Sequence, residues 1–346
     1  MERTTKWMIA AVYRISLAVG IISFCHDQTT EKFYFSTMVT IYSAFASLVM
    51  LGFLRYFFQL NFSSPHLPVK INAIIFLLRG LCLVVTVFIN WTKRQEIVTT
   101  LNELRQARYQ FQKRWPLSEN TKRKFEKTLR RKLKLGFATT TGILLTLIES
   151  AKIQFELESV YAIAAVILMC SVGSFVMMNF FLCITHLNVI LWAVNEEVEK
   201  ILKTTYQLWQ LSMQQYIGPG TLITQCCRLS DDLDNLAATQ HQLHLLGNRI
   251  NRMYDLQTGC VLLMIYLNNV AVCYMAYPTA EKDQITDNYS NWTIVLMPFV
   301  MIMYYIDLII FLKSLMHFHE AFLATKKLFR EHQALLPTLD VRLEES

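Results

Sequence analysis

Three charged residues interrupt long apolar stretches of this sequence: Arg79, Glu149 and Asp307. An ionised side chain at the centre of a bilayer costs roughly 2.5–3.5 kcal/mol on insertion scales, so it faces protein groups or water rather than lipid. Tyr304 and Tyr305 stand just before Asp307 and add two hydroxyl groups. These five residues are therefore candidates for a ligand-binding site inside a helical bundle.

The depth of each charge in its apolar stretch indicates which charges can pair. Counted from the outer ends at about 1.5 Å per residue, Arg79 lies roughly 12 Å deep and Asp307 roughly 22 Å deep. Glu149 lies within about 6 Å of the depth of Arg79, so Glu149 is the expected partner. Two interpretations stay open: a structural ion pair that permits insertion, or part of a ligand pocket that opens outward. Hydrogen bonds between helices would also account for the two tyrosines.

Other residue patterns do not predict catalysis or metal binding. The basic run at residues 122–132 could bind nucleic acid or anionic lipid, and its position beside an apolar stretch favours membrane lipid. No carboxylate or cysteine completes a metal site with His241 and His244, or with His317 and His319. The sequence has no Gly-rich phosphate loop and no catalytic motif, so neither an enzyme nor a cofactor is expected.

The composition places these residues in a membrane protein. Of 346 residues, 53% are hydrophobic and only 17% are charged. A hydrocarbon core about 30 Å thick needs roughly 20 apolar residues per helix. The predicted fold is therefore an all-α integral membrane protein, a polytopic bundle of about six transmembrane helices spread over residues 33–312. The predicted spans are 33–54, 71–91, 135–148 with an extension toward Gln154, 159–185, 256–280 and 292–312.

Charge outside the spans predicts the orientation. Most of the 33 lysines and arginines lie in residues 1–32, 92–134, 186–255 and 313–346. Cytosolic segments carry an excess of Lys and Arg, so these four segments and the amino terminus are expected in the cytosol. The apolar stretch from Ile15 to Cys25 is predicted as a short interfacial helix rather than a signal peptide.

Glycosylation sequons provide a second indication of topology. Those at Asn61 and Asn288 fall in expected external loops and are predicted to carry glycan. The sequon at Asn90 falls at the cytosolic edge of a span and is predicted to stay unused.

The two long cytosolic connections, 92–134 and 186–255, are predicted to be helical. In the first, Pro116 separates two helical stretches, because proline suits the start of a helix better than its interior. In the second, the helix of the fourth span is expected to continue to the break at Gly218-Pro219-Gly220. The next helix is expected to run from about Thr221 into the fifth span. It carries an apolar stripe that needs a packing partner: Leu229, Leu233, Leu236, Leu243, Leu246, Ile250 and Tyr254.

Three segments of the sequence resemble the insect gustatory receptor family. Residues 187–198, containing Val194-Asn195-Glu196-Glu197-Val198, are similar to the stretch after the family's fourth span. Residues 241–257 are similar to its approach to the fifth span, and residues 339–346 to the segment before its seventh helix. The resemblance covers nearly the whole chain.

The resemblance implies a receptor rather than an enzyme. It implies a subunit that assembles with like or different gustatory receptor subunits as a tetramer, forming a ligand-gated cation channel. The channel would open on a small-molecule tastant in the plasma membrane of gustatory sensory neurons, without a cofactor.

The carboxyl-terminal segment departs from the family pattern. In the family a seventh helix with a Thr-Tyr, five apolar residues, Gln-Phe signature lines the pore, and no apolar window follows residues 292–312 here. We therefore expect this chain to lack the pore helix and not to conduct alone. Two other classes of membrane protein fit the sequence less well. The orientation and the lack of external cysteines disfavour a G-protein-coupled receptor, and the lack of matching Gly- or Pro-broken spans disfavours a secondary transporter.

Overall fold

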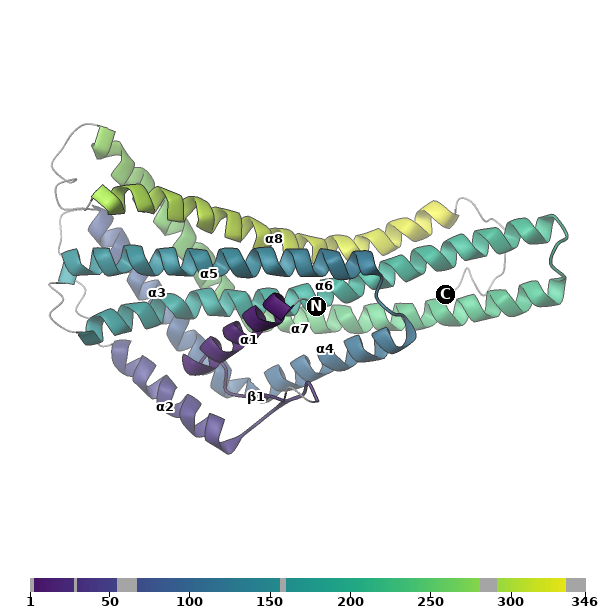
Figure 1. Cartoon of the computed structure of the whole chain (residues 1–346), viewed down its shortest axis with the longest axis horizontal. Coiled ribbons are helices and arrows are strands. Elements are labelled where there is room, and N and C mark those ends of the chain that lie inside the picture. Colours follow the sequence, from purple (N-terminus) through teal and green to yellow (C-terminus); the bar gives the residue numbers. More distant parts are fainter. Residues whose placement is uncertain (1–2, 28–29, 55–66, 156–159, 281–290, 334–346) are drawn as a thin grey trace.

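The computed structural model of the protein is a bundle of long helices (Figure 1). In the described residues the helices are α1 (Arg3–Ala18), α2 (Thr37–Phe53), α3 (Leu67–Thr92), α4 (Arg94–Arg114), α5 (Glu119–Phe155), α6 (Val160–Met213), α7 (Pro219–Ala280) and α8 (Asn291–Gln333). Two short strands, β1 (Cys25–His26) and β2 (Phe33–Tyr34), pair antiparallel. The structure describes residues 3–27, 30–54, 67–155, 160–280 and 291–333.

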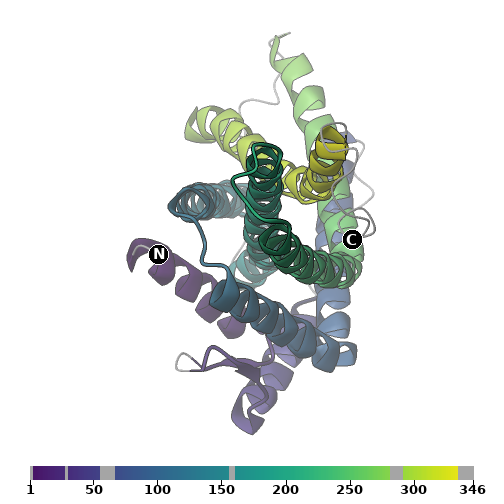
Figure 2. The ribbon, with the colours of Figure 1, turned by 90° about the vertical axis from the view of Figure 1, so that its right-hand side faces the viewer.

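Helices α5 to α8 run along the long axis of the molecule, and α6 and α7 extend farthest at one end (Figure 1). Seen from that end, the shorter helices α1, α2 and α4 lie to one side of this group (Figure 2). The helices longer than a bilayer is thick therefore continue beyond the membrane as one packed bundle.

The predicted helix break between the fourth and fifth spans is confirmed. Helix α6 ends at Met213 after 54 residues, and α7 begins at Pro219 and continues for 62 residues. Proline is favoured in the first helical turn because its missing N–H would have no partner there. A single helix thus joins the connection after α6 to the predicted fifth span, as expected.

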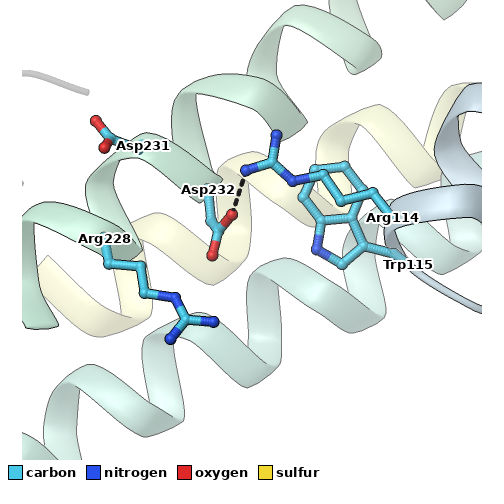
Figure 3. Close-up of a pocket in the computed structure, with 5 residues that line it drawn as sticks. All are labelled: Arg114, Trp115, Arg228, Asp231 and Asp232. Atoms are coloured by element: carbon cyan, nitrogen blue, oxygen red, sulfur yellow. Dashed lines mark hydrogen bonds and ion pairs between the residues drawn. The ribbon is translucent and has the colours of Figure 1, made fainter.

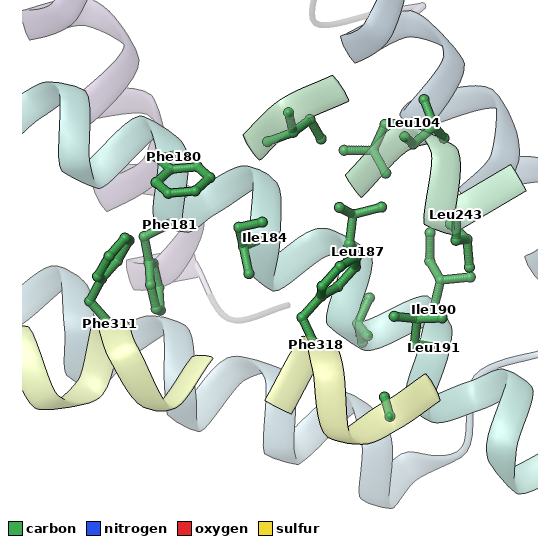
Figure 4. Packing of buried hydrophobic residues seen from close by; sticks show 14 of the residues in the cluster. Leu104, Phe180, Phe181, Ile184, Leu187, Ile190, Leu191, Leu243, Phe311 and Phe318 are labelled. Carbon is green, nitrogen blue, oxygen red and sulfur yellow. The ribbon is translucent and has the colours of Figure 1, made fainter. Parts of the chain in front are cut away.

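The apolar stripe of α7 has the packing partner that its spacing predicted. Leu233, Leu236, Leu243, Leu246 and Ile250 are buried in the main core, which α6 and α8 complete. Figure 4 shows Leu243 beside Ile190 and Leu191 of α6, and Phe318 of α8 beside Leu187. The core is therefore continuous from the predicted spans into the helices that connect them.

Glycine permits the closest helix contact in this core. A Cβ atom at Gly247 of α7 would overlap the ring of Phe318 on α8. At Gly142 of α5, a Cβ atom would stand 2.7 Å from a methyl carbon of Val300 on α8. Both contacts set how near α8 lies to its neighbours.

The prediction for the amino-terminal segment was wrong in position. The helix is Arg3–Ala18 rather than residues 15–25, because the chain turns at Gly20, whose φ is 77°. Beyond the turn, Ile22 and Phe24 are buried against Val98 of α4 instead of lying on a membrane surface.

The first predicted span begins later than residue 33. Phe33 lies in β2, where the Asn102 side chain of α4 accepts from its backbone N–H at 3.0 Å and donates to its carbonyl at 2.9 Å. The Tyr13 hydroxyl donates to the Phe24 carbonyl and accepts from the His26 N–H. These contacts hold the strand pair against α1 and α4, so α2 starts only at Thr37.

Three described helical segments are long and apolar enough to cross a membrane: Ala73–Thr92, Ser171–Met213 and Phe299–Glu331. Helix α2 is apolar as well, although shorter at 17 residues. On α2, the apolar side chains of Met38, Phe45 and Leu48 are exposed, as on a surface that faces lipid. The protein is an all-α integral membrane protein.

Candidate functional site

The most buried charge in the described residues is the ammonium group of Lys132 on α5. Its side chain is 2% exposed, and Nζ lies 2.6 Å from Oδ2 of Asp307 on α8. The same ammonium donates to the Asp307 carbonyl at 3.1 Å. It also lies 5.6 Å from the ring centre of Phe181 and 5.7 Å from that of Phe311. A carboxylate, a carbonyl and two aromatic faces thus compensate one buried cation.

Gly136 of α5 lies beside this ion pair, where a larger side chain would meet its neighbours. A Cβ atom at Gly136 of α5 would lie 3.0 Å from the sulfur of Met178 and 3.8 Å from Oδ1 of Asp307. Oδ1 of Asp307 is buried and accepts no hydrogen bond in the described residues. The carboxylate therefore keeps an unused acceptor in the interior of the bundle.

The structure brings Arg79 and Tyr304 toward this pair. Tyr304 lies one helical turn before Asp307 on α8 and packs against the main core. Its hydroxyl interacts electrostatically with both Arg79 and Asp307. The Arg79 guanidinium on α3 lies 5.7 Å from the ring centre of Phe76. Tyr304 and Asp307 thus lie one turn apart on α8, and Arg79 of α3 lies within electrostatic range of the Tyr304 hydroxyl.

Tyr305 and Glu149 are placed differently. The Tyr305 side chain is 37% exposed, and its hydroxyl donates to Oδ1 of Asn269 on α7. Glu149 lies on α5, but its side chain is outside the described residues. The predicted pairing of Arg79 with Glu149 therefore stays a prediction.

Of the sequon residues Asn61, Asn90 and Asn288, the structure describes Asn90. Asn61 and Asn288 lie outside the described residues. Asn90 is 4% exposed, its Oδ1 accepts from the Ser23 hydroxyl at 2.9 Å, and its amide donates to the Gly20 carbonyl. An asparagine held in this way is inaccessible to glycosylation in the folded protein.

Sequence reasoning missed Lys132, which it assigned to the basic run at the inner leaflet. The signal was periodicity: Lys132 stands three residues after Leu129 and four before Gly136, on the buried face of α5. A lysine in register with an apolar stripe needs a buried partner, and Asp307 on α8 supplies it.

The stretch of α6 that contains Asn195 takes part in contacts with α5, α7 and α8. The Asn195 amide on α6 donates to the Ala321 carbonyl of α8 at 2.9 Å, and its Oδ1 accepts from Thr325 at 2.6 Å. Gln240 of α7 donates to Thr325 at 3.0 Å. Next to Asn195, the Glu196 carboxylate accepts from Thr121 of α5 at 2.6 Å.

Residues 241–257 of α7, which lead into the fifth predicted span, also contact neighbouring helices. Tyr254 stacks on Phe180 with ring centres 4.9 Å apart, and Gln257 donates to Thr86 of α3 at 3.1 Å. Arg249 pairs with Glu103 of α4 at 2.8 Å. Both stretches singled out in the sequence therefore hold helices to one another.

An open pocket of about 350 Å³ lies elsewhere, where the end of α4 meets α7 (Figure 3). Arg114 and Asp232 form an ion pair of 2.6 Å on its wall, and Trp115, Arg228 and Asp231 complete the lining. It contains none of the predicted site residues. Within the described part of the chain, no group of three or more His, Cys, Asp or Glu residues could hold a metal ion.

Comparison with known proteins gives the family. The model of the family described as 7tm chemosensory receptor matches residues 9–346. Two relatives from Drosophila melanogaster extend over nearly the whole chain. Putative gustatory receptor 36c is 22% identical over 99% of this chain and 86% of its own length. Putative gustatory receptor 36b is 21% identical over 98% and 85%. The chain therefore belongs to the 7tm chemosensory receptor family.

Proposed function

We propose that this protein is a gustatory receptor subunit of a ligand-gated cation channel that opens on a small-molecule tastant. The observation that carries the proposal is the family match from residue 9 to residue 346, together with full-length similarity to proteins named as gustatory receptors. The subunit would work in the plasma membrane of gustatory sensory neurons, as a tetramer with like or different gustatory receptor subunits. Its amino terminus would lie in the cytosol.

The tastant would act at the polar region between α3 and α8. Arg79 and Tyr304 supply a cation and a hydroxyl inside otherwise apolar spans, and such groups mark ligand pathways in membrane proteins. Glu149 would balance Arg79 from α5, and Tyr305 would hold α8 to α7. Asp307 is engaged by Lys132, so its role would be to hold α8 on α5 while the ligand binds nearby.

A secondary transporter, a G-protein-coupled receptor and a channel subunit would respond differently to an applied tastant. A secondary transporter would accumulate substrate without a ligand-gated current, and a G-protein-coupled receptor would respond only where a G-protein cascade is present. A channel subunit gives a cation current within the membrane patch itself. Recording from excised patches while a panel of tastants is applied separates the three classes.

The site is tested by co-expressing the protein with gustatory receptor subunits of the same neurons and measuring tastant-evoked calcium entry. Tyr304→Phe should raise the half-maximal tastant concentration about fivefold, since a hydrogen bond contributes about 1 kcal/mol. Tyr216→Phe is the matched control, because Tyr216 is 77% exposed at the α6–α7 turn. Equal responses of the two variants would remove Tyr304 from the site, and a lack of any tastant response would contradict the proposed function.

A further inference from the structure

The basic run of α5 divides between two faces of the helix. Lys132 points into the bundle, whereas Arg123, Lys127, Arg131 and Lys134 are exposed. These four follow one another at steps of four, four and three residues, so they form one stripe along α5. None of the four makes an ion pair with another residue that the structure describes.

The stripe begins at the inner end of a span. Lys134 directly precedes the apolar stretch that starts at Leu135. At about 1.5 Å per residue, Arg131 lies roughly 4.5 Å farther from that stretch, Lys127 roughly 10 Å and Arg123 roughly 16 Å. The polar headgroup layer of one leaflet is about 5–7 Å thick. Arg131 and Lys134 thus lie at headgroup level, and the other two lie beyond it.

Helix α1 brings further cations beside α5 and α6. It packs on α5 and α6 through Val12 and through a hydrogen bond of 3.0 Å from Asn179 of α6 to Ser16. Its carboxyl end is held at α2, where the Tyr42 hydroxyl donates to the Ala18 carbonyl. Both views place α1 beside the α5 and α6 pair (Figures 1 and 2).

The outward face of α1 suits a lipid surface. Arg3, Lys6 and Arg14 are exposed, and α1 contains no Asp or Glu. Trp7 directly follows Lys6 in the sequence and is 69% exposed. An indole ring beside cations is the composition of an interfacial anchor, because the ring lies at the headgroup level while the cations meet lipid phosphates.

We propose that the exposed faces of α1 and α5 together bind anionic glycerophospholipid headgroups of the inner leaflet, through Arg3, Lys6 and Arg14 around Trp7 and through Arg131 and Lys134. The occupant is an anionic headgroup because Arg131 and Lys134 are exposed at headgroup depth, and α1 adds exposed cations and the exposed Trp7 ring on a helix that packs on α5. The inference depends on the membrane placement of the helices and is independent of which tastant the receptor recognises.

The experiment measures quenching of tryptophan fluorescence in phosphatidylcholine vesicles that contain a minor fraction of brominated lipid. Brominated phosphatidylserine is compared with brominated phosphatidylcholine, and a Trp7→Phe variant isolates the contribution of Trp7. The wild-type protein should be quenched more by phosphatidylserine, and high salt should abolish the difference. Arg131→Gln/Lys134→Gln should lower that preference about fivefold for each charge removed.

The matched control is Arg123→Gln/Lys127→Gln, which removes the same charge from the same exposed face of α5, farther from the spans. This control should lose clearly less of the preference, because Arg123 lies about a Debye length of 8–10 Å beyond the headgroup layer and is largely screened, and Lys127 lies outside that layer. An equal loss in both double variants, or no lipid preference in the wild-type protein, would overturn the proposal. Competition by inorganic phosphate at an ionic strength held constant with chloride would also overturn it, since it would point to a site for free anions.

Discussion

At the scale of single residues, the pair of Lys132 and Asp307 shows how a charge can be kept in the interior of a membrane bundle. Desolvation of two ions opposes burial, and their attraction offsets it only with good geometry and further hydrogen bonds. Here the ammonium reaches Oδ2 at 2.6 Å and a carbonyl at 3.1 Å. The pair is thus satisfied on the lysine side, and removal of either member leaves a buried charge alone.

Lys132→Met should destabilise the folded protein by about 3–5 kcal/mol, because Asp307 would lose its counter-charge. The double variant Lys132→Met/Asp307→Leu should recover most of that loss, since a well-packed apolar pair of similar volume is often neutral. SDS titration of the purified protein, followed by circular dichroism, measures both.

The exposed pair of Lys203 and Glu199 is the control for this cycle. Its N–O distance is also 2.6 Å, but both side chains are largely in solvent. Lys203→Met should cost less than about 1 kcal/mol. If Lys132→Met and Lys203→Met lowered the free energy of unfolding by a similar amount, burial of the Lys132–Asp307 pair would have no energetic consequence.

The candidate site was only partly predictable from single residues. Arg79 and Asp307 are visible in the sequence because each interrupts an apolar window. Lys132 is hidden, because it belongs to a run of basic residues that ends just before Leu135. Its partner stands 175 positions away, so only the packing of α5 on α8 reveals it.

At the scale of elements, local patterns predicted the long helices and failed at the amino terminus. Apolar windows, Pro116 and the break near Pro219 are local signals, and α3 to α8 follow them. The strand pair depends instead on Asn102, 69 positions from Phe33. Such a long-range contact overrides the local apolar pattern that favoured a helix, so neither the end of α1 nor the start of α2 was predicted.

The contact of α7 with α8 depends on a missing side chain at Gly247. Gly247→Ala should destabilise the protein by about 1–3 kcal/mol, because its Cβ atom would overlap the ring of Phe318 and force the helices apart. Gly259→Ala on the same helix is the control. Nothing lies within 4 Å of its added Cβ, so this change should stabilise the helix by about 0.5–1 kcal/mol. Equal effects of the two changes in SDS titration would contradict the close approach.

The polar junction of α6, α7 and α8 gives a second prediction for elements. Asn195→Ala removes the acceptor of Thr325 and a donor to the Ala321 carbonyl, and it should cost about 1–3 kcal/mol because the partners are partly buried. Asn235→Ala is the control, since Asn235 is exposed on α7 and bonds only within its own helix among the described contacts. The prediction fails if the two alanine variants unfold at the same SDS fraction.

At the scale of the whole molecule, the continuous core makes the helices predicted to be cytosolic a packed extension of the spans. Helices α6 and α7 are each far longer than the roughly 20 residues that cross a bilayer. Helix α8, which carries Tyr304 of the proposed ligand region, continues for 43 residues and packs on α6, so motion of α8 at that region would be transmitted to the far end of the bundle. This continuity gives the proposed receptor a direct mechanical connection between its two halves.

The proposed receptor has its amino terminus in the cytosol, and surface labelling of a tag measures that orientation. A tag placed before Met1 should be inaccessible to antibody in intact cells and accessible after permeabilisation, because the basic segments 1–32 and 92–134 are retained in the cytosol. Glycan should be present on Asn61 and Asn288, so Asn61→Gln/Asn288→Gln should abolish the mobility shift that glycosidase produces. Asn90→Gln should leave that shift unchanged, because Asn90 lies at the cytosolic edge and its amide is bonded to Ser23 and Gly20. Surface staining of the tag in intact cells, or a glycan that disappears with Asn90→Gln, would place the cytosolic bundle on the wrong side and reverse the proposed topology.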